Sequence, residues 1–104
     1  MALLVQASQT MLRQFEHWLK INASCPFLYN ANHLTESIVI DIDNEKYIAR
    51  FTAWDDGSCF SEVILIETGV YIMDKIENYV GLDGLVDLFH IFLEHCDSRY
   101  ITSQ

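Results

Sequence analysis

The chain has 104 residues, of which 51% are hydrophobic and 20% charged, and this composition predicts a single globular domain spanning residues 1–104. Fifteen acidic residues against six basic ones give a formal net charge of -9, which disfavours a nucleic acid as partner because binding to phosphates requires clustered Lys and Arg. The same charge favours solubility and rapid encounter with a basic protein.

The first expected element is a helix from about Ser8 to Ile21. It should end before Cys25-Pro26, since proline disfavours a helical residue in front of it. The next segment, Pro26–Thr35, mixes turn formers with large apolar residues, and we expect an ordered loop packed on the core. The helix is predicted from apolar residues that recur at helical spacing, namely Met11, Leu12, Phe15, Trp18 and Leu19.

Two strands, Ser37–Asp43 and Lys46–Trp54, are expected next because apolar and polar residues alternate along both. A tight turn at Asn44-Glu45 would join them into a hairpin with its core residues on one face. Asp41 and Arg50 would then lie on the other face. The expected cross-strand pairs are Ile42 with Tyr47, Ile40 with Ala49 and Ile38 with Phe51.

A third strand, Cys59–Glu67, is expected after the turn at residues 55–58, and a fourth over Val70–Ile76. The third strand contains four consecutive apolar residues, Val63–Ile66, which indicates burial on both of its faces. Loops, a helix or a second copy of the chain could cover the second face. A homodimer would use Val63 and Leu65.

The last expected element is a helix from about Asp83 to Cys96, with Asp83 as its N-cap. The pattern therefore predicts an α+β fold: an N-terminal helix, a four-stranded antiparallel meander and a C-terminal helix, with both helices packed on one sheet face. The apolar stripe of this helix consists of Leu85, Leu88, Phe89, Phe92 and Leu93.

No complete catalytic or metal-binding pattern is present in the sequence. Asp41 and Asp43, with Asp55 and Asp56, are carboxylates that could suit a divalent cation, but their spacing matches no Ca²⁺ loop and favours solvent-facing positions. His90 and His95 are five residues apart, which places them on different sides of a helix, whereas helical zinc ligands need a spacing of three or four. We therefore expect a protein that is not an enzyme and has no cofactor or metal.

Three widely spaced cysteines without a CxxC pair favour reduced thiols and a cytoplasmic protein. The first five residues are too short and lack the basic segment of a signal peptide. There is no run of about 20 apolar residues, so we expect neither a membrane span nor a membrane partner.

Trp54 lies on the polar face of the expected hairpin, together with Arg50. Trp and Arg are the residue types that most often dominate protein interfaces. Trp54 could equally cap the sheet edge or pack beneath the Pro26–Thr35 loop, and the sequence leaves both interpretations open.

The central strands and turns resemble the TriTu family of small bacterial immunity proteins. The upstream segment Phe15-Glu16-His17-Trp18-Leu19 is also similar to the N-terminal part of that family. The residues that carry the resemblance are Ile40-Asp41-Ile42-Asp43, Tyr47-Ile48-Ala49-Arg50, Thr52, Trp54, Gly57, Cys59, Glu62-Val63 and Glu67-Thr68-Gly69.

The resemblance implies a cytoplasmic immunity protein that binds and neutralises a cognate toxin domain of a polymorphic or contact-dependent system, without catalysis. Many such toxins act on nucleic acid through a basic cleft, which an acidic domain can block sterically and electrostatically. The alternative is a homo-oligomeric structural or adaptor domain. The expected contact residues for a toxin are Asp41, Asp43, Arg50, Trp54, Asp55 and Asp56.

Overall fold

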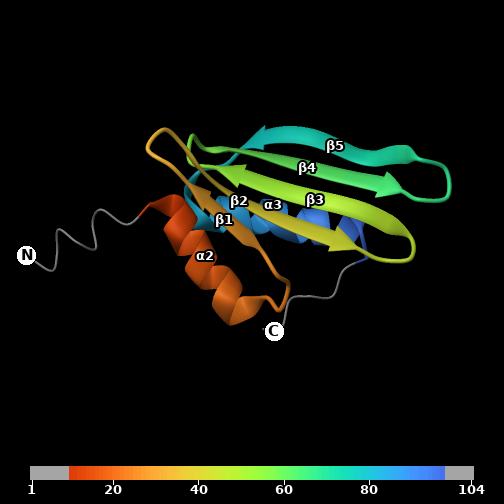
Figure 1. Cartoon of the computed structure of the whole chain (residues 1–104), viewed down its shortest axis with the longest axis horizontal. Helices are drawn as coiled ribbons and strands as arrows, with labels where there is room; N and C mark the ends of the chain where they lie inside the picture. The colour runs from red at the N-terminus through yellow and green to blue at the C-terminus, as the bar shows by residue number, and fades with distance from the viewer. Residues whose placement is uncertain (1–9, 98–104) are drawn as a thin grey trace, which may run out of the picture.

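The computed structural model describes residues 10–97, which form two helices and a five-stranded antiparallel sheet (Figure 1). The strands follow one another in the sheet in chain order, so the sheet is a simple meander. Both helices lie on the same face of the sheet, as the sequence predicts. The elements are α2 (Met11–Asn22), β1 (Leu28–Ala31), β2 (Glu36–Asp43), β3 (Tyr47–Trp54), β4 (Ser58–Leu65), β5 (Val70–Asn78) and α3 (Gly81–His95).

Helix α2 begins with Thr10 as its N-cap, whose hydroxyl accepts a hydrogen bond from the backbone N–H of Arg13 at 3.2 Å. The expected start at Ser8 lies outside the described residues. The predicted apolar stripe is confirmed, because Leu12, Phe15 and Leu19 are buried against the sheet.

Strand β1 corrects the expectation of a four-stranded sheet. Leu28–Ala31 lies within the segment expected to be a loop and pairs with β2, with Tyr29 opposite Ile38. Tyr29 also donates a hydrogen bond to the Glu36 carboxylate at 2.5 Å, which adds a side-chain contact between β1 and β2.

The register of the β2–β3 hairpin is also different from the expected one. Ile42 pairs with Ala49 rather than with Tyr47, because the turn has Glu45 and Lys46 at its tip instead of Asn44 and Glu45. Asn44 determines the position of the turn, since its side-chain oxygen accepts hydrogen bonds from the backbone N–H groups of Lys46 and Tyr47 at 2.9 and 2.8 Å. The register shift is two residues, so every side chain keeps its expected face.

The apolar run in β4 does not require a second chain. Val63 lies on the helix-covered face and is fully buried, and Leu65 on the same face packs against the core. The prediction that Val63 serves as a dimer contact is therefore wrong, because no surface of this side chain remains accessible. Ile64 points to the opposite face, and Ile66 lies beyond the end of the strand.

Helix α3 begins at Gly81, two residues before the expected start. The N-cap is Val80, which makes no side-chain capping bond, so the prediction of Asp83 as N-cap is wrong. Asp83 lies instead in the first turn, where a carboxylate interacts favourably with the helix dipole.

The core between the sheet and the helices centres on aromatic rings. Phe89 of α3 contacts Phe51 of β3 and Phe15 of α2, with ring centroids 5.3 and 5.8 Å apart. Trp18 of α2 stacks on Phe15, with ring centroids 6.1 Å apart, and so adds its indole to this cluster. These contacts fix both helices to one face, and no helix of residues 10–97 lies on the other face of the sheet.

Candidate interaction surface

The sheet face opposite the helices, here called the outer face, carries two kinds of residue in cross-strand rows. One row is apolar apart from a threonine and runs through Leu28, Val39, Thr52, Phe60 and Ile76. The neighbouring row is charged and runs through Asp41, Arg50, Glu62 and Asp74.

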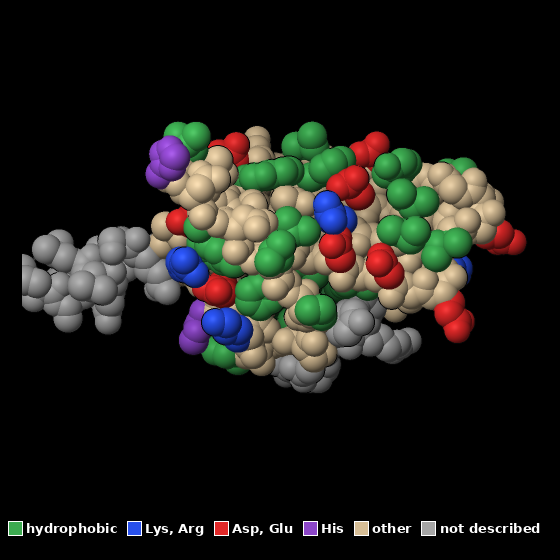
Figure 2. All heavy atoms as spheres, in the orientation of Figure 1, with side chains coloured by type: hydrophobic (Ala, Val, Ile, Leu, Met, Phe, Trp, Pro, Cys, Tyr) green, Lys and Arg blue, Asp and Glu red, His purple; other side chains and the backbone are tan. Residues whose placement is uncertain are grey.

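Hydrophobic side chains at the surface of the sheet surround a small group of acidic and basic ones (Figure 2). Ile48 is 50% exposed and Ile76 is 71% exposed, and these large apolar groups lie on the same face of the sheet. Thr52 is only 8% exposed, because Val39 and Phe60 flank it across the sheet.

Arg50 and Asp41 form a bidentate ion pair between β3 and β2. The Arg50 Nε donates to Asp41 Oδ1 at 2.6 Å, and the second guanidinium nitrogen donates to Oδ2 at 3.0 Å. The hydrogen bond and charge of Asp41 raise the pKa of Arg50, so the guanidinium stays protonated at any physiological pH.

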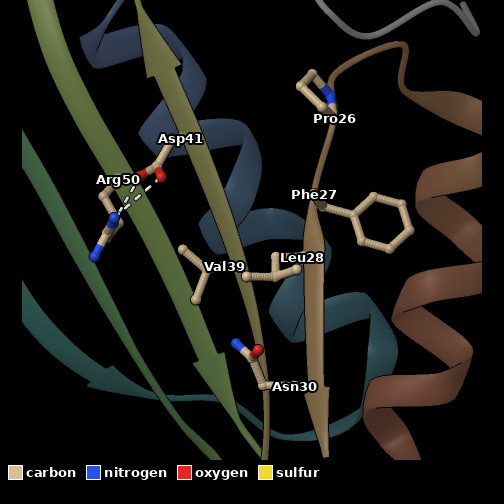
Figure 3. A pocket seen from close by; sticks show the side chains of 7 residues that line it. All are labelled: Pro26, Phe27, Leu28, Asn30, Val39, Asp41 and Arg50. Atoms are coloured by element: carbon tan, nitrogen blue, oxygen red, sulfur yellow. Dashed lines mark hydrogen bonds and ion pairs between the residues drawn. The ribbon is translucent and has the colours of Figure 1, made fainter.

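Two open hollows adjoin this ion pair. One, of about 480 Å³, lies between β1 and β2, and the side chains of Leu28 and Val39 lie in it side by side (Figure 3). Phe27 points away from it toward α2. The other hollow, of about 270 Å³, is lined by Asp43, Glu62 and Ile64 among others. Asp41 and Arg50 line both hollows, so the ion pair separates an apolar depression from an acidic one.

The residues expected as a single contact set fall into two groups. Asp41, Asp43 and Arg50 lie together, whereas Trp54 lies opposite Ser37, six residues from Asp43 along β2. This separation corresponds to about 20 Å at the usual rise of a strand. Asp55 and Asp56 follow Trp54 in the β3–β4 turn.

The turn that carries Asp55 and Asp56 is held by local hydrogen bonds. Asp56 accepts from both the hydroxyl and the backbone N–H of Ser58 at 2.6 and 3.0 Å, and these bonds lower the pKa of its carboxyl. Tyr79 donates to the carbonyl of Trp54 at 2.6 Å. The Trp54 side chain is half-buried on the outer face. This second group is therefore an ordered, acidic end of the sheet.

The sequence interpretation did not include the outer-face residues of β4 and β5 in the contact set. Glu62 and Asp74 continue the charged row, while Phe60 and Ile76 continue the apolar one. The signal that could have identified them is their alternation with the buried residues Ser61, Val63 and Met73.

The described residues contain no group of three or more His, Cys, Asp or Glu side chains that could hold a metal ion. His90 instead packs edge-on against Trp18, and His95 lies with Nδ1 2.8 Å from the carbonyl oxygen of Ile91. Cys25, Cys59 and Cys96 are all buried. Between residues 10 and 97, no helix is long and apolar enough to cross a membrane.

A mixed apolar and acidic sheet face of this kind is a surface suited to binding another protein. Residues 13–95 match the family described as Immunity protein TriTu, which covers most of the chain. The chain belongs to the TriTu immunity protein family, and its role is therefore in toxin neutralisation in general. Immunity proteins are generally not catalysts. No curated protein matches the sequence.

Proposed function

We propose that this protein binds a cognate toxin domain in the cytoplasm through the outer face and blocks it sterically and electrostatically, without catalysis. The observation that carries the proposal is the outer face itself, where exposed apolar residues flank a charged row and no helix of residues 10–97 covers them. Exposed large apolar side chains gathered on one face of a soluble domain mark a surface for binding another protein.

The charges of the outer face favour a basic toxin surface, such as the cleft of a nuclease domain. Asp41, Asp43, Glu62 and Asp74 are opposed by Arg50 alone among the paired residues of this face. Complementary charge accelerates encounter, and desolvated apolar contacts then slow dissociation. Ile48 and the apolar hollow beside Leu28 are suited to the desolvated contacts that slow dissociation.

Within this proposal the first group, Asp41, Asp43 and Arg50, contributes to the central contact. Trp54, Asp55 and Asp56 form a second contact at the far end of the sheet, where the half-buried indole offers its exposed edge. Arg50 and Trp54 are four residues apart on β3, about 13 Å, so a toxin domain can touch both groups within a standard protein interface.

We expect the gene of the cognate toxin to lie next to the gene of this protein, and co-expression with the C-terminal domain of that toxin tests the proposal. We expect rescue of growth and co-purification of the two proteins. Ile48→Asp should weaken the complex at least about tenfold, because it places a charge in the apolar part of the contact. Ile91→Asp is the matched control, since Ile91 is 42% exposed on α3 and away from the outer face. Equal losses from both variants, or no rescue by the wild type, would refute the proposal.

A further inference from the structure

The edge strand β5 is mostly exposed. Among its nine residues only Met73 is buried, and Val70, Tyr71, Ile72 and Ile76 are 41–71% exposed. In Figure 1 no ribbon of the described chain lies beyond β5. A long, exposed and apolar edge is a template for pairing with another strand.

Charged side chains on an edge strand ordinarily oppose such pairing. On β5 these are Asp74, Lys75 and Glu77. If two copies of β5 pair antiparallel with their faces aligned, a two-fold axis at Asp74 sets Asp74 against itself. An axis at Lys75 likewise sets Lys75 against itself, and like charges directly opposite one another destabilise a sheet.

One alignment converts these charges into favourable contacts. With the two-fold axis at Ile76, Lys75 of each copy lies opposite Glu77 of the other, which gives two Lys–Glu pairs. Asp74 then faces Asn78, and the two Ile76 side chains meet on the outer face. Lys75 and Glu77 already share the helix side of the sheet, where their charged atoms lie 3.8 Å apart within one chain.

The same alignment extends the apolar row of the outer face. In one chain this row ends at Ile76, after Leu28, Val39, Thr52 and Phe60. A second copy that meets the first at Ile76 continues the row into its own Phe60 without interruption. The exposed end of the row is thereby covered by an identical apolar end.

We propose that β5 pairs antiparallel with β5 of a second copy of this chain about a two-fold axis at Ile76, forming a continuous ten-stranded sheet. The choice of a second copy over a foreign strand rests on the self-complementary order of Lys75 and Glu77 around Ile76. The proposed dimer does not depend on the toxin binding proposed above.

Sedimentation equilibrium and light scattering of the full chain, without toxin, test the proposal. We expect twice the mass of one chain at micromolar concentrations. Lys75→Glu should weaken the dimer about tenfold, since it sets two pairs of carboxylates face to face. The double variant Lys75→Glu/Glu77→Lys should restore it, because the pairing is reversed but intact. A monomer at all concentrations, or a double variant no tighter than the single one, would overturn the proposal.

Cross-linking tests the register separately. Directly opposed residues of an antiparallel pair have Cα atoms about 4.5–5.5 Å apart, within the range that a disulfide can bridge. Ile76→Cys should therefore form an intermolecular disulfide under mild oxidation. Val70→Cys is the control, because Val70 is 56% exposed on the same strand but has no opposed strand residue in this register. Equal cross-linking of both variants would refute the register, and so would a dimer of Ile76→Cys that does not cross-link.

Discussion

Arg50 and Asp41 hold each other across β2 and β3 through two hydrogen bonds of 2.6 and 3.0 Å, and this pair separates the two hollows of the outer face. Both side chains are about half exposed, so water competes with the ion pair and screens it. The pair therefore shapes the surface more than it stabilises the fold.

The first prediction concerns the energy of this ion pair. A double-mutant cycle of Asp41→Ala and Arg50→Ala should give a coupling of about 0.2–1 kcal/mol, the range for exposed ion pairs. The free energy of unfolding in urea is the measurement. A coupling that does not decrease in 1 M salt would contradict the assignment of an exposed electrostatic pair.

The second prediction concerns the acidic side chains of β4 and β5. Reversing Glu62 and Asp74 to Lys should slow association with a basic toxin domain and reduce the dependence of the association rate on salt. Asp87→Lys provides the control, because Asp87 is exposed on α3 and its reversal changes the net charge in the same direction. Stopped-flow association kinetics measure both. If Asp87→Lys slows association as much, overall charge rather than the outer face governs encounter.

The third prediction concerns Asn44, which holds the β2–β3 turn and also donates from Nδ2 to the carbonyl of Cys96 at 3.1 Å. Asn44→Ala should cost on the order of 1–3 kcal/mol of unfolding free energy, because three hydrogen bonds are lost. Glu45→Ala, at the exposed tip of the same turn, should change it by less than about 0.5 kcal/mol. Urea denaturation followed by circular dichroism distinguishes the two.

The fourth prediction concerns the aromatic core. Phe89→Ala should destabilise the protein by about 3–5 kcal/mol, since Phe89 is fully buried among Phe15, Phe51 and Phe92. Leu34→Ala, where the side chain is 79% exposed, should have almost no effect. Thermal unfolding measures both, and a small loss for Phe89→Ala would mean that the helices pack more loosely on the sheet than described.

The fifth prediction concerns the reactivity of Cys59. Burial, with a smaller contribution from the charge of Glu77, raises the pKa of this thiol from 9.0 to about 11. At neutral pH its thiolate fraction is therefore about 100-fold below that of an ordinary cysteine, so alkylation of the folded protein should be correspondingly slow. The unfolded chain deprotonates first, so this group favours folding below pH 9 and the contribution is lost as pH rises toward 11. Rapid labelling of Cys59 at pH 7.5 without unfolding would contradict this.

The sequence was sufficient to predict the two helices and the four long strands. Apolar residues recur at helical spacing in the helices and alternate along β2 and β3, and the turn at residues 55–58 marks the start of β4. It did not reveal β1, since Leu28–Ala31 has four residues and only Tyr29 is partly covered. So short a strand leaves no alternation that distinguishes it from a loop.

The register of the β2–β3 hairpin could not be settled from the alternation either. A two-residue shift preserves both faces, so the pattern fits either turn. The hydrogen bonds from Lys46 and Tyr47 to the Asn44 side chain decide between them, and the Nδ2 of Asn44 also donates to the carbonyl of Cys96. For the candidate site, alternation assigns Asp41, Arg50 and Trp54 to one face, and the bounds of the expected strand already place Trp54 at its far end. Alternation does not show that Glu62 and Asp74 continue the charged row, because that depends on the pairing of β4 with its two neighbours.

The two tryptophans of the chain lie on opposite sides of the sheet. Trp18 packs with Phe15 and Phe89 in the helix layer, whereas Trp54 is half-buried on the outer face. The two indoles are therefore natural fluorescent probes of different events. With Trp54 replaced by Phe, the emission of Trp18 would follow unfolding of the core. With Trp18 replaced by Phe, Trp54 would report what approaches the exposed side of the sheet, with no external label.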